Sequence, residues 1–312
     1  MTRRTTTIAW ISCVVLAIVV ARPAAPAEPV PWNLDRIDQR ALPLDGRFVH
    51  QGNGAGVHAY VIDTGVRKSH REFGGRADWI GDFTTGNPGS PDAEDCDVPD
   101  SKGHGTHVAS ILGGRTYGSA SGVTLHALRI LPCTGTTRTD FAAAVRAVDW
   151  ITAHGRHPGI VNISPARWQT ADTALDDAVR RSIAAGFLYV LSAGGLDNVT
   201  TFSPQRVREA VVVGSTSRTD APATSGYGPG LTLFAPGIQI PGAANLGDTA
   251  TFVGDGDSYA APLAAGVGAV YLQRHPTATA AQVKNAIVAA ATPGVVANPG
   301  QAPNLLLHTI VR

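Results

Sequence analysis

Short apolar runs alternate with longer segments of helical periodicity along most of this 312-residue chain. Six runs of six to eight mainly apolar residues predict buried β-strands. These runs are Gly56–Asp63, Thr124–Leu131, Gly159–Ser164, Phe187–Gly194, Ala210–Ser215 and Leu231–Gly237. Because the runs are apolar without strict alternation, they are typical of a sheet that is covered on both faces.

Segments with apolar residues at helical spacing lie between and after these strands. The first has Thr139 or Asp140 in front of it as an N-cap, and the second, residues 173–185, is stopped by Gly186. Two late helices are predicted over residues 258–275 and 279–292. The alternation of strands and helices predicts a single α/β domain with a mostly parallel β-sheet and helices on both faces.

The first 27 residues differ from the rest of the chain. A basic start is followed by the apolar run Ile8–Val20, and Ala25 and Ala27 fit a small-residue cleavage pattern. This pattern predicts a secretory signal peptide over residues 1–27 and a single domain over residues 28–312. An uncleaved N-terminal anchor is the alternative, although the run is shorter than the roughly 20 residues of a membrane span.

Composition and charge exclude several classes of partner. Cleavage after Ala27 lowers Lys and Arg from 25 to 22 against 24 acids, so the mature net charge is −2. We expect no nucleic-acid partner, because binding to phosphates needs clustered positive charge. We also expect a monomer with no membrane contact after cleavage.

Cys96 and Cys133 remain in the mature chain, and in an exported protein they indicate a disulfide, with two free thiols as the alternative.

Three polar residues stand where predicted strands end or helices begin. Asp63 closes a strand, His104 opens a short helix after a glycine-flanked loop, and Ser258 lies at the mouth of a late helix. Taken singly, each has an ordinary structural interpretation: a turn for the aspartate, a structural role for His104 or its neighbour His107, a helix start for the serine. Their combination, in the order Asp, His, Ser, indicates a serine nucleophile activated by a base.

The segments VIDTGV, GHGTHVA and GDSYAAP carry these residues. Together they resemble the motifs of the subtilisin-like serine peptidases (family S8), in particular the proteinase K-like branch. Further similar segments, from PWNLDRID to FAPG, extend the resemblance over nearly all of residues 28–312. The resemblance implies a peptidase domain in which Asp63, His104 and Ser258 form the catalytic triad. His104 is then the base, Asp63 orients it, and Ser258 is the nucleophile.

Two departures from the family pattern concern the oxyanion site. Gly195 stands where the family has an asparagine whose side chain donates to the oxyanion, and Asn198 lies three residues further on. Asp257 stands where the family has threonine, directly before Ser258. A carboxylate there opposes developing negative charge and raises the pKa of a neighbouring histidine. Asp257 is also a good N-cap residue, and both interpretations stay open.

Two segments expected to bind extended substrate have diverged as well. In the family, substrate adds as a strand between two extended segments. One of them reads SPAR here, so Ser164, Pro165 and Ala166 are the candidate substrate-binding residues, and Pro165 lacks a backbone donor. The other reads GTT and begins at Gly135. The substrate side chains that this chain prefers do not follow from the family.

The resemblance has further implications away from the cleft. Cys96 and Cys133 resemble a disulfide of secreted members, which would brace the loop before His104. No propeptide is evident between the cleavage site and the domain. The acid expected at a calcium site is replaced by Ser217, and Asp220 is the nearby substitute. We therefore predict no metal ion or other cofactor, with structural calcium as an unsupported alternative.

These observations predict a secreted serine endopeptidase that hydrolyses polypeptide through an acyl-enzyme intermediate. The alternative is a catalytically impaired homologue that binds peptides or a protein partner, because of Gly195, Asp257 and Pro165. The complete triad favours the enzyme. Losing an oxyanion donor costs roughly 3–4 kcal/mol, whereas losing the triad serine or histidine costs about 10⁶-fold.

Overall fold

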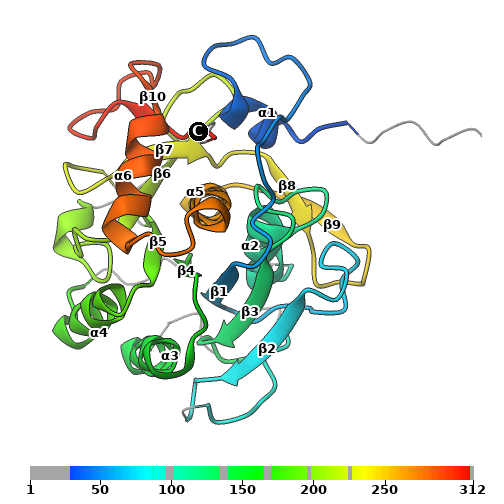
Figure 1. Ribbon diagram of the computed structural model, residues 1–312, viewed down its shortest axis with the longest axis vertical. Coiled ribbons are helices and arrows are strands. Elements are labelled where there is room, and N and C mark those ends of the chain that lie inside the picture. Colours follow the sequence, from blue (N-terminus) through cyan, green and yellow to red (C-terminus); the bar gives the residue numbers. More distant parts are fainter. Residues whose placement is uncertain are drawn as a thin grey trace, which may run out of the picture.

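The computed structural model describes residues 29–86, 88–95, 102–133, 140–164, 170–194, 198–223 and 227–309. Within these residues, nine strands form one sheet in the order β10-β11-β7-β6-β5-β4-β1-β3-β2 (Figure 1). The strands are β1 (His58–Asp63), β2 (Ala77–Asp82), β3 (Thr124–Arg129), β4 (Gly159–Ile163), β5 (Leu188–Ser192), β6 (Val211–Thr216), β7 (Leu233–Pro236), β10 (Thr292–Pro293) and β11 (Leu305–Leu306). Neighbours from β11 to β2 pair in parallel, and β10 pairs antiparallel with β11.

Helices cover both faces of this sheet (Figure 1), and each face of the sheet packs into its own apolar core. On one face lie α2 (His104–Gly113), α5 (Asp257–Arg274) and α6 (Ala280–Ala290). On the other face lie α3 (Phe141–His154) and α4 (Thr173–Ala184). Strand β1 shows the period of two that this requires, since Val61 packs into the first core and Ile62 into the second.

The structure confirms the predicted α/β domain and the positions of its main elements. Each of the six predicted strands is present, with ends that differ from the prediction by at most two residues. Asp140 is the N-cap of α3 and accepts from the N–H of Ala142. Helix α4 ends at Ala184, two residues before Gly186, which adopts a φ of +105°. The predicted signal peptide lies outside the described residues.

Several elements were not predicted from the sequence. They are the helix α1 (Trp32–Asp38), the edge strand β2, the short helix η1 (Val199–Thr201), the hairpin of β8 (Ile240–Ala243) and β9 (Thr251–Gly254), and the short strands β10 and β11. Strands β2 and β9 are only partly buried, so their sequences lack the apolar runs that mark the central strands. Among the described residues, no helix combines the length and the apolar character needed to span a bilayer.

Candidate active site

Strand β1 brings Asp63 to the carboxyl edge of the sheet. The Asp63 side chain is fully buried, and its Oδ1 lies 2.7 Å from Nδ1 of His104. The same oxygen accepts from the backbone N–H of Thr64 at 2.8 Å. Because the carboxylate accepts at Nδ1, the proton of a neutral His104 ring is held there and Nε2 is left as the basic nitrogen.

Glycines allow α2 to begin beside this carboxylate. Gly103 is the N-cap of α2 with a φ of +87°, a conformation that side chains rarely adopt. Gly105 packs so closely on the end of β1 that a Cβ there would lie 2.1 Å from the carbonyl oxygen of Gly65. The glycine between His104 and Thr106 is therefore required for the helix to present His104 to Asp63.

His107 lies one turn further along α2 and is a structural residue. Its ring is fully buried, with Nδ1 3.1 Å from the carbonyl of Ala243 and Nε2 3.1 Å from that of Ile240. Both carbonyls favour the protonated ring, but burial outweighs them and lowers the pKa of His107 to about 3. A neutral His107 anchors the β8–β9 hairpin to α2.

Ser258 lies in the first turn of α5, and the helix approaches His104 through the residue after it. The ring of the following residue, Tyr259, has its centroid 5.6 Å from that of His104. The N-cap of α5 is Gly256 with a φ of +145°, so the interpretation of Asp257 as the N-cap is wrong. Asp257 is instead the first helical residue and is buried, in the turn where the helix dipole favours a negative charge.

Ser164 and Ser258 exchange two hydrogen bonds. The Ser258 hydroxyl donates to the carbonyl of Ser164 at 2.9 Å, and the Ser164 hydroxyl donates to the carbonyl of Ser258 at 2.9 Å. The sequence explains the second bond. Pro262 stands four residues after Ser258 and has no N–H, so the helix cannot satisfy that carbonyl by itself. Ser164 supplies the missing donor from the end of β4.

Comparison with known proteins agrees with this geometry. The model of the subtilase family (peptidase family S8) matches residues 54–305. The chain belongs to this family. It is 47% identical over 291 residues to an extracellular serine proteinase of Thermus sp. (strain Rt41A), covering 92% of this chain and 68% of that protein.

Two further similarities support the assignment to the subtilases. An alkaline serine exoprotease A of Vibrio alginolyticus is 41% identical over 281 residues, which cover 89% of this chain and 50% of that protein. The crystal structure of a cold-adapted subtilisin-like serine proteinase superposes with a TM-score of 0.84 at 37% identity, covering 91% of this chain and 100% of that one. This chain therefore spans about two thirds of the Thermus relative and half of the Vibrio relative.

Several predicted site residues of this subtilase lie outside the described residues. They are Gly195, Gly135, Pro165, Ala166 and Cys96. Cys133 is disulfide-bonded, and its pairing with Cys96 stays a prediction.

Two described residues near the diverged segments have structural contacts of their own. Asn198 is the N-cap of η1, and its Oδ1 accepts from the N–H of Thr200 at 3.0 Å and from the Thr200 hydroxyl at 2.8 Å. Ser164 is fully buried and holds Ser258, so its proposed substrate contact also remains a prediction.

Asp95, a buried carboxylate close to Asp63, was not predicted from the sequence. Its oxygens accept from the hydroxyl of Thr64, next to Asp63, and from Thr106 of α2. Nothing in the order of the residues identifies it, since Asp95 is one acid among several in the segment 92–100. The contacts appear only when the end of β1 and the start of α2 are placed side by side.

Asp220, the acid nearest to the replaced position of the family's calcium site, is paired with an arginine. Arg36 Nε lies 2.8 Å from Asp220 Oδ1, and a second guanidinium nitrogen lies 2.9 Å from Oδ2, with the Arg36 side chain fully buried. Both carboxylate oxygens thus bind α1 to the loop after β6. Among the described residues, no group of three or more His, Cys, Asp or Glu side chains is placed to hold a metal ion.

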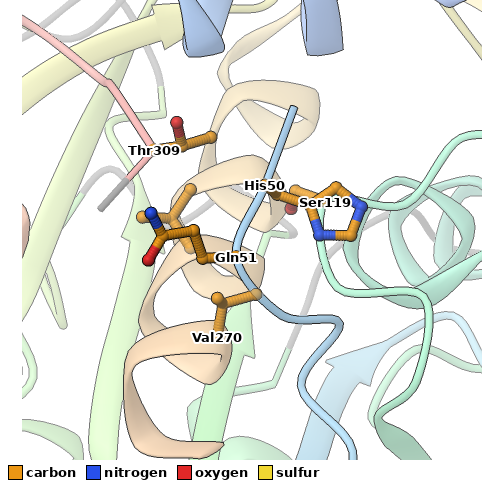
Figure 2. A pocket seen from close by; sticks show the side chains of 6 residues that line it. His50, Gln51, Ser119, Val270 and Thr309 are labelled. Carbon is orange, nitrogen blue, oxygen red and sulfur yellow. The ribbon is translucent and has the colours of Figure 1, made fainter. Parts of the chain in front are cut away.

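A small cavity lies beside α5, away from Ser258 (Figure 2). It has room for about one water molecule, and its lining includes the hydroxyl of Thr309, which is buried without a partner among the described residues. The residues that line it are His50, Gln51, Ser119, Val267, Val270 and Thr309. Val267 lies nine residues along α5 from Ser258, about 13 Å at the helical rise, so this cavity is no substrate pocket.

Proposed function

We propose that this subtilase is a secreted serine endopeptidase that uses Asp63, His104 and Ser258 as its triad. The observation that carries the proposal is the 2.7 Å contact between His104 Nδ1 and Asp63 Oδ1 beside the first turn of α5, where Ser258 lies. A base oriented in this way by a buried carboxylate is what a serine hydroxyl needs to become a nucleophile.

Each residue has a defined part in the reaction. The Ser258 hydroxyl turns from the Ser164 carbonyl to His104, and its oxygen attacks the carbonyl carbon of the scissile peptide as its proton passes to Nε2. His104 then gives this proton to the leaving amine, which breaks the C–N bond and leaves an ester on Ser258. Water, activated by His104, hydrolyses the ester. Asp63 stays ionised and stabilises the imidazolium.

The start of α5 supports the negative oxygen of the intermediate. The first N–H groups of a helix have no helical partners and lie at the positive end of its dipole. Ser258, second in α5, therefore offers its own N–H to the oxyanion. Gly195 brings no side-chain donor of the kind that the family has at that position.

Secretion and the substrate class follow from the family and the sequence. The Thermus relative is named an extracellular serine proteinase, and residues 1–27 of this chain predict a signal peptide. Polypeptide is the substrate class of subtilases. A monomer without nucleic-acid or membrane partners agrees with the mature charge of −2.

The alternative function is that of a catalytically impaired homologue that binds a peptide or protein partner. Asp257 favours it, because this buried carboxylate is adjacent to the nucleophile and opposes the charge of an oxyanion. The two functions differ in the reactivity of Ser258 and in turnover of peptide, so one reagent and one substrate separate them.

The test is covalent labelling of the mature protein by a fluorophosphonate probe near pH 7.5, followed by hydrolysis of casein. Labelling that is lost in Ser258→Ala and strongly reduced in His104→Ala supports the triad. Ser69→Ala, at an exposed serine on the loop after β1, is the control and should label like the parent. A parent protein that does not label contradicts the proposal, and one that labels without cleaving casein supports the impaired homologue.

A further inference from the structure

We propose that Asp95 is a positioning residue of the triad, whose ionised carboxylate ties the end of β1 to the start of α2 and so holds His104 against Asp63. The inference rests on the proposed function. It concerns a residue that touches neither the nucleophile nor the base directly.

The contacts of Asp95 reach both neighbours of the Asp63–His104 pair. Asp95 Oδ1 accepts from the Thr64 hydroxyl at 2.7 Å. Asp95 Oδ2 accepts from the backbone N–H of Thr106 at 2.8 Å and from the Thr106 hydroxyl. Thr64 directly follows Asp63, and Thr106 lies two residues after His104. One carboxylate therefore fixes the residue next to the triad acid and the first turn of the helix that carries the base.

The two threonines pass this constraint on to the triad. Thr64 donates its N–H to Asp63 Oδ1 at 2.8 Å, and its hydroxyl oxygen accepts from the N–H of Gly105 at 2.8 Å. The hydroxyl of Thr106 accepts from the N–H of Arg67 at 3.0 Å. Because both hydroxyls already accept, their hydrogens are free to point at Asp95. The geometry forms a closed network in which each bond fixes the next.

This network requires Asp95 to be ionised. A carboxylate accepts hydrogen bonds only, whereas a protonated carboxyl presents a donor to groups that are themselves donating. Burial raises the pKa of Asp95 to about 6, and the negative charge of Asp63 acts in the same direction. Below about pH 6, Asp95 therefore takes up a proton and one of its hydrogen bonds is lost.

The other polar and charged groups that face Asp95 do not compete with it for this proton. Tyr259, from α5, is kept neutral because burial raises the pKa of its hydroxyl. The guanidinium of Arg67 faces Asp248 at 2.8 Å and Glu94 at 3.9 Å, and only its backbone N–H joins the network. The carbonyl of Asp95 accepts from the amide of Asn245 at 3.2 Å, which has no charge to change.

A distinctive pH dependence follows. The reaction of Ser258 needs a neutral His104 and, on this inference, an ionised Asp95. Below pH 6 the logarithm of the labelling rate constant should therefore fall with a slope that approaches 2 per pH unit, because two protons inactivate the protein. If Asp95 had a merely structural role, its substitution would lower activity without changing this slope.

The experiment compares the fluorophosphonate labelling rate of the parent, Asp95→Asn and the control Asp176→Asn between pH 4.5 and 8. Asp176 is a buried aspartate of α4 that pairs with Arg206, so it reports the general effect of losing a buried carboxylate. We expect Asp95→Asn to label about 10²-fold more slowly at pH 7.5, as for a misplaced catalytic group, with a slope near 1. Asp176→Asn should keep the slope of the parent.

A pair of threonine variants tests the inference if Asp95→Asn does not fold. Thr64→Ser keeps the hydroxyl and should label at nearly the parent rate, whereas Thr64→Val should lose most of the rate. A slope of 1 in the parent, parent-like labelling by folded Asp95→Asn, or equal labelling by the two Thr64 variants overturns the inference. A parent that does not label at all instead refutes the proposed function.

Discussion

The Ser164 hydroxyl occupies the place of the N–H that Pro262 lacks, donating at 2.9 Å to the carbonyl of Ser258. Ser258 is thereby held both by its own helix α5 and by the residue that follows β4. The amide of Asn162 contacts the Ser164 hydroxyl at 2.8 Å and keeps it in place. These bonds connect the motif that contains Ser258 and Pro262 with Ser164, which precedes this motif by almost one hundred positions.

We first predict that Ser164→Ala destabilises the protein and slows labelling of Ser258. The Ser258 carbonyl would then be left without a donor in a partly buried position, at a cost of about 1–3 kcal/mol. Urea unfolding monitored by circular dichroism measures this loss. The double variant Ser164→Ala/Pro262→Ala should recover part of it, because the new N–H of residue 262 can donate to Ser258. Additive effects of the two substitutions would contradict this explanation.

The Ser164 contact also shows where sequence reasoning reached its limit. The candidate triad was predicted because Asp63 closes a strand, His104 and Ser258 begin helices, and their motifs resemble those of the subtilases. Ser164 was predicted only as a wall of the substrate cleft. The missing N–H of Pro262 was visible in the sequence, but the donor that replaces it follows only from the packing of α5 on β4. Asp95 was missed for the same reason, since its partners Thr64 and Thr106 lie at the end of β1 and in α2, and strand β2 separates these two elements in the chain.

A second prediction concerns the buried ion pair of Arg36 and Asp220. Asp220→Asn leaves the fully buried guanidinium of Arg36 without its counter-charge, which costs about 3–5 kcal/mol. The exposed pair Arg180–Asp177 offers a matched control, because its side chains are 43% and 52% exposed. Asp177→Asn should change the unfolding free energy by roughly 0.5 kcal/mol or less. Equal losses in the two variants would show that burial of the first pair does not determine its contribution.

A third prediction concerns His126, a buried histidine of β3 in contact with His58 at 2.9 Å. Burial, with His58 as a further cause, lowers the pKa of His126 to about 4. The unfolded chain, in which a histidine has a pKa of about 6.5, therefore binds more protons than the folded chain between these values. The unfolding free energy falls as the pH drops through this window, by about 2 kcal/mol from this group between pH 7.5 and pH 5.

Urea unfolding of His126→Phe at both pH values isolates this contribution. The variant keeps an aromatic ring against Tyr60, whose centroid lies 4.9 Å away, and cannot take up a proton. The comparison with the parent is needed because Asp95 has a raised pKa in the folded chain. Its protonation therefore raises the unfolding free energy as the pH drops across the same window, which opposes the effect of His126. The exposed His275 provides the control, and His275→Gln should keep the parent's pH dependence. A parent-like dependence in His126→Phe would refute the assignment.

The last prediction asks whether the two changes at the oxyanion site limit turnover. We expect Gly195→Asn combined with Asp257→Thr to raise the kcat for peptide hydrolysis several-hundred-fold or more. One oxyanion donor of this type is worth roughly 10²–10³-fold in a subtilisin, and removing the buried carboxylate takes away a charge that opposes the oxyanion. The single variants separate the two causes, since Asp257→Thr alone changes the charge and Gly195→Asn alone adds the donor.

The labelling rate distinguishes the explanations that remain if turnover does not rise. A double variant that labels at the parent rate and hydrolyses no faster would show that neither the missing donor nor Asp257 limits the reaction. The cause would then lie in substrate binding, where Pro165 cannot donate a backbone hydrogen bond to an added strand. Pro165→Leu, with Ala166→Gly, should in that case lower the KM for extended peptides and leave the rate of Ser258 labelling unchanged.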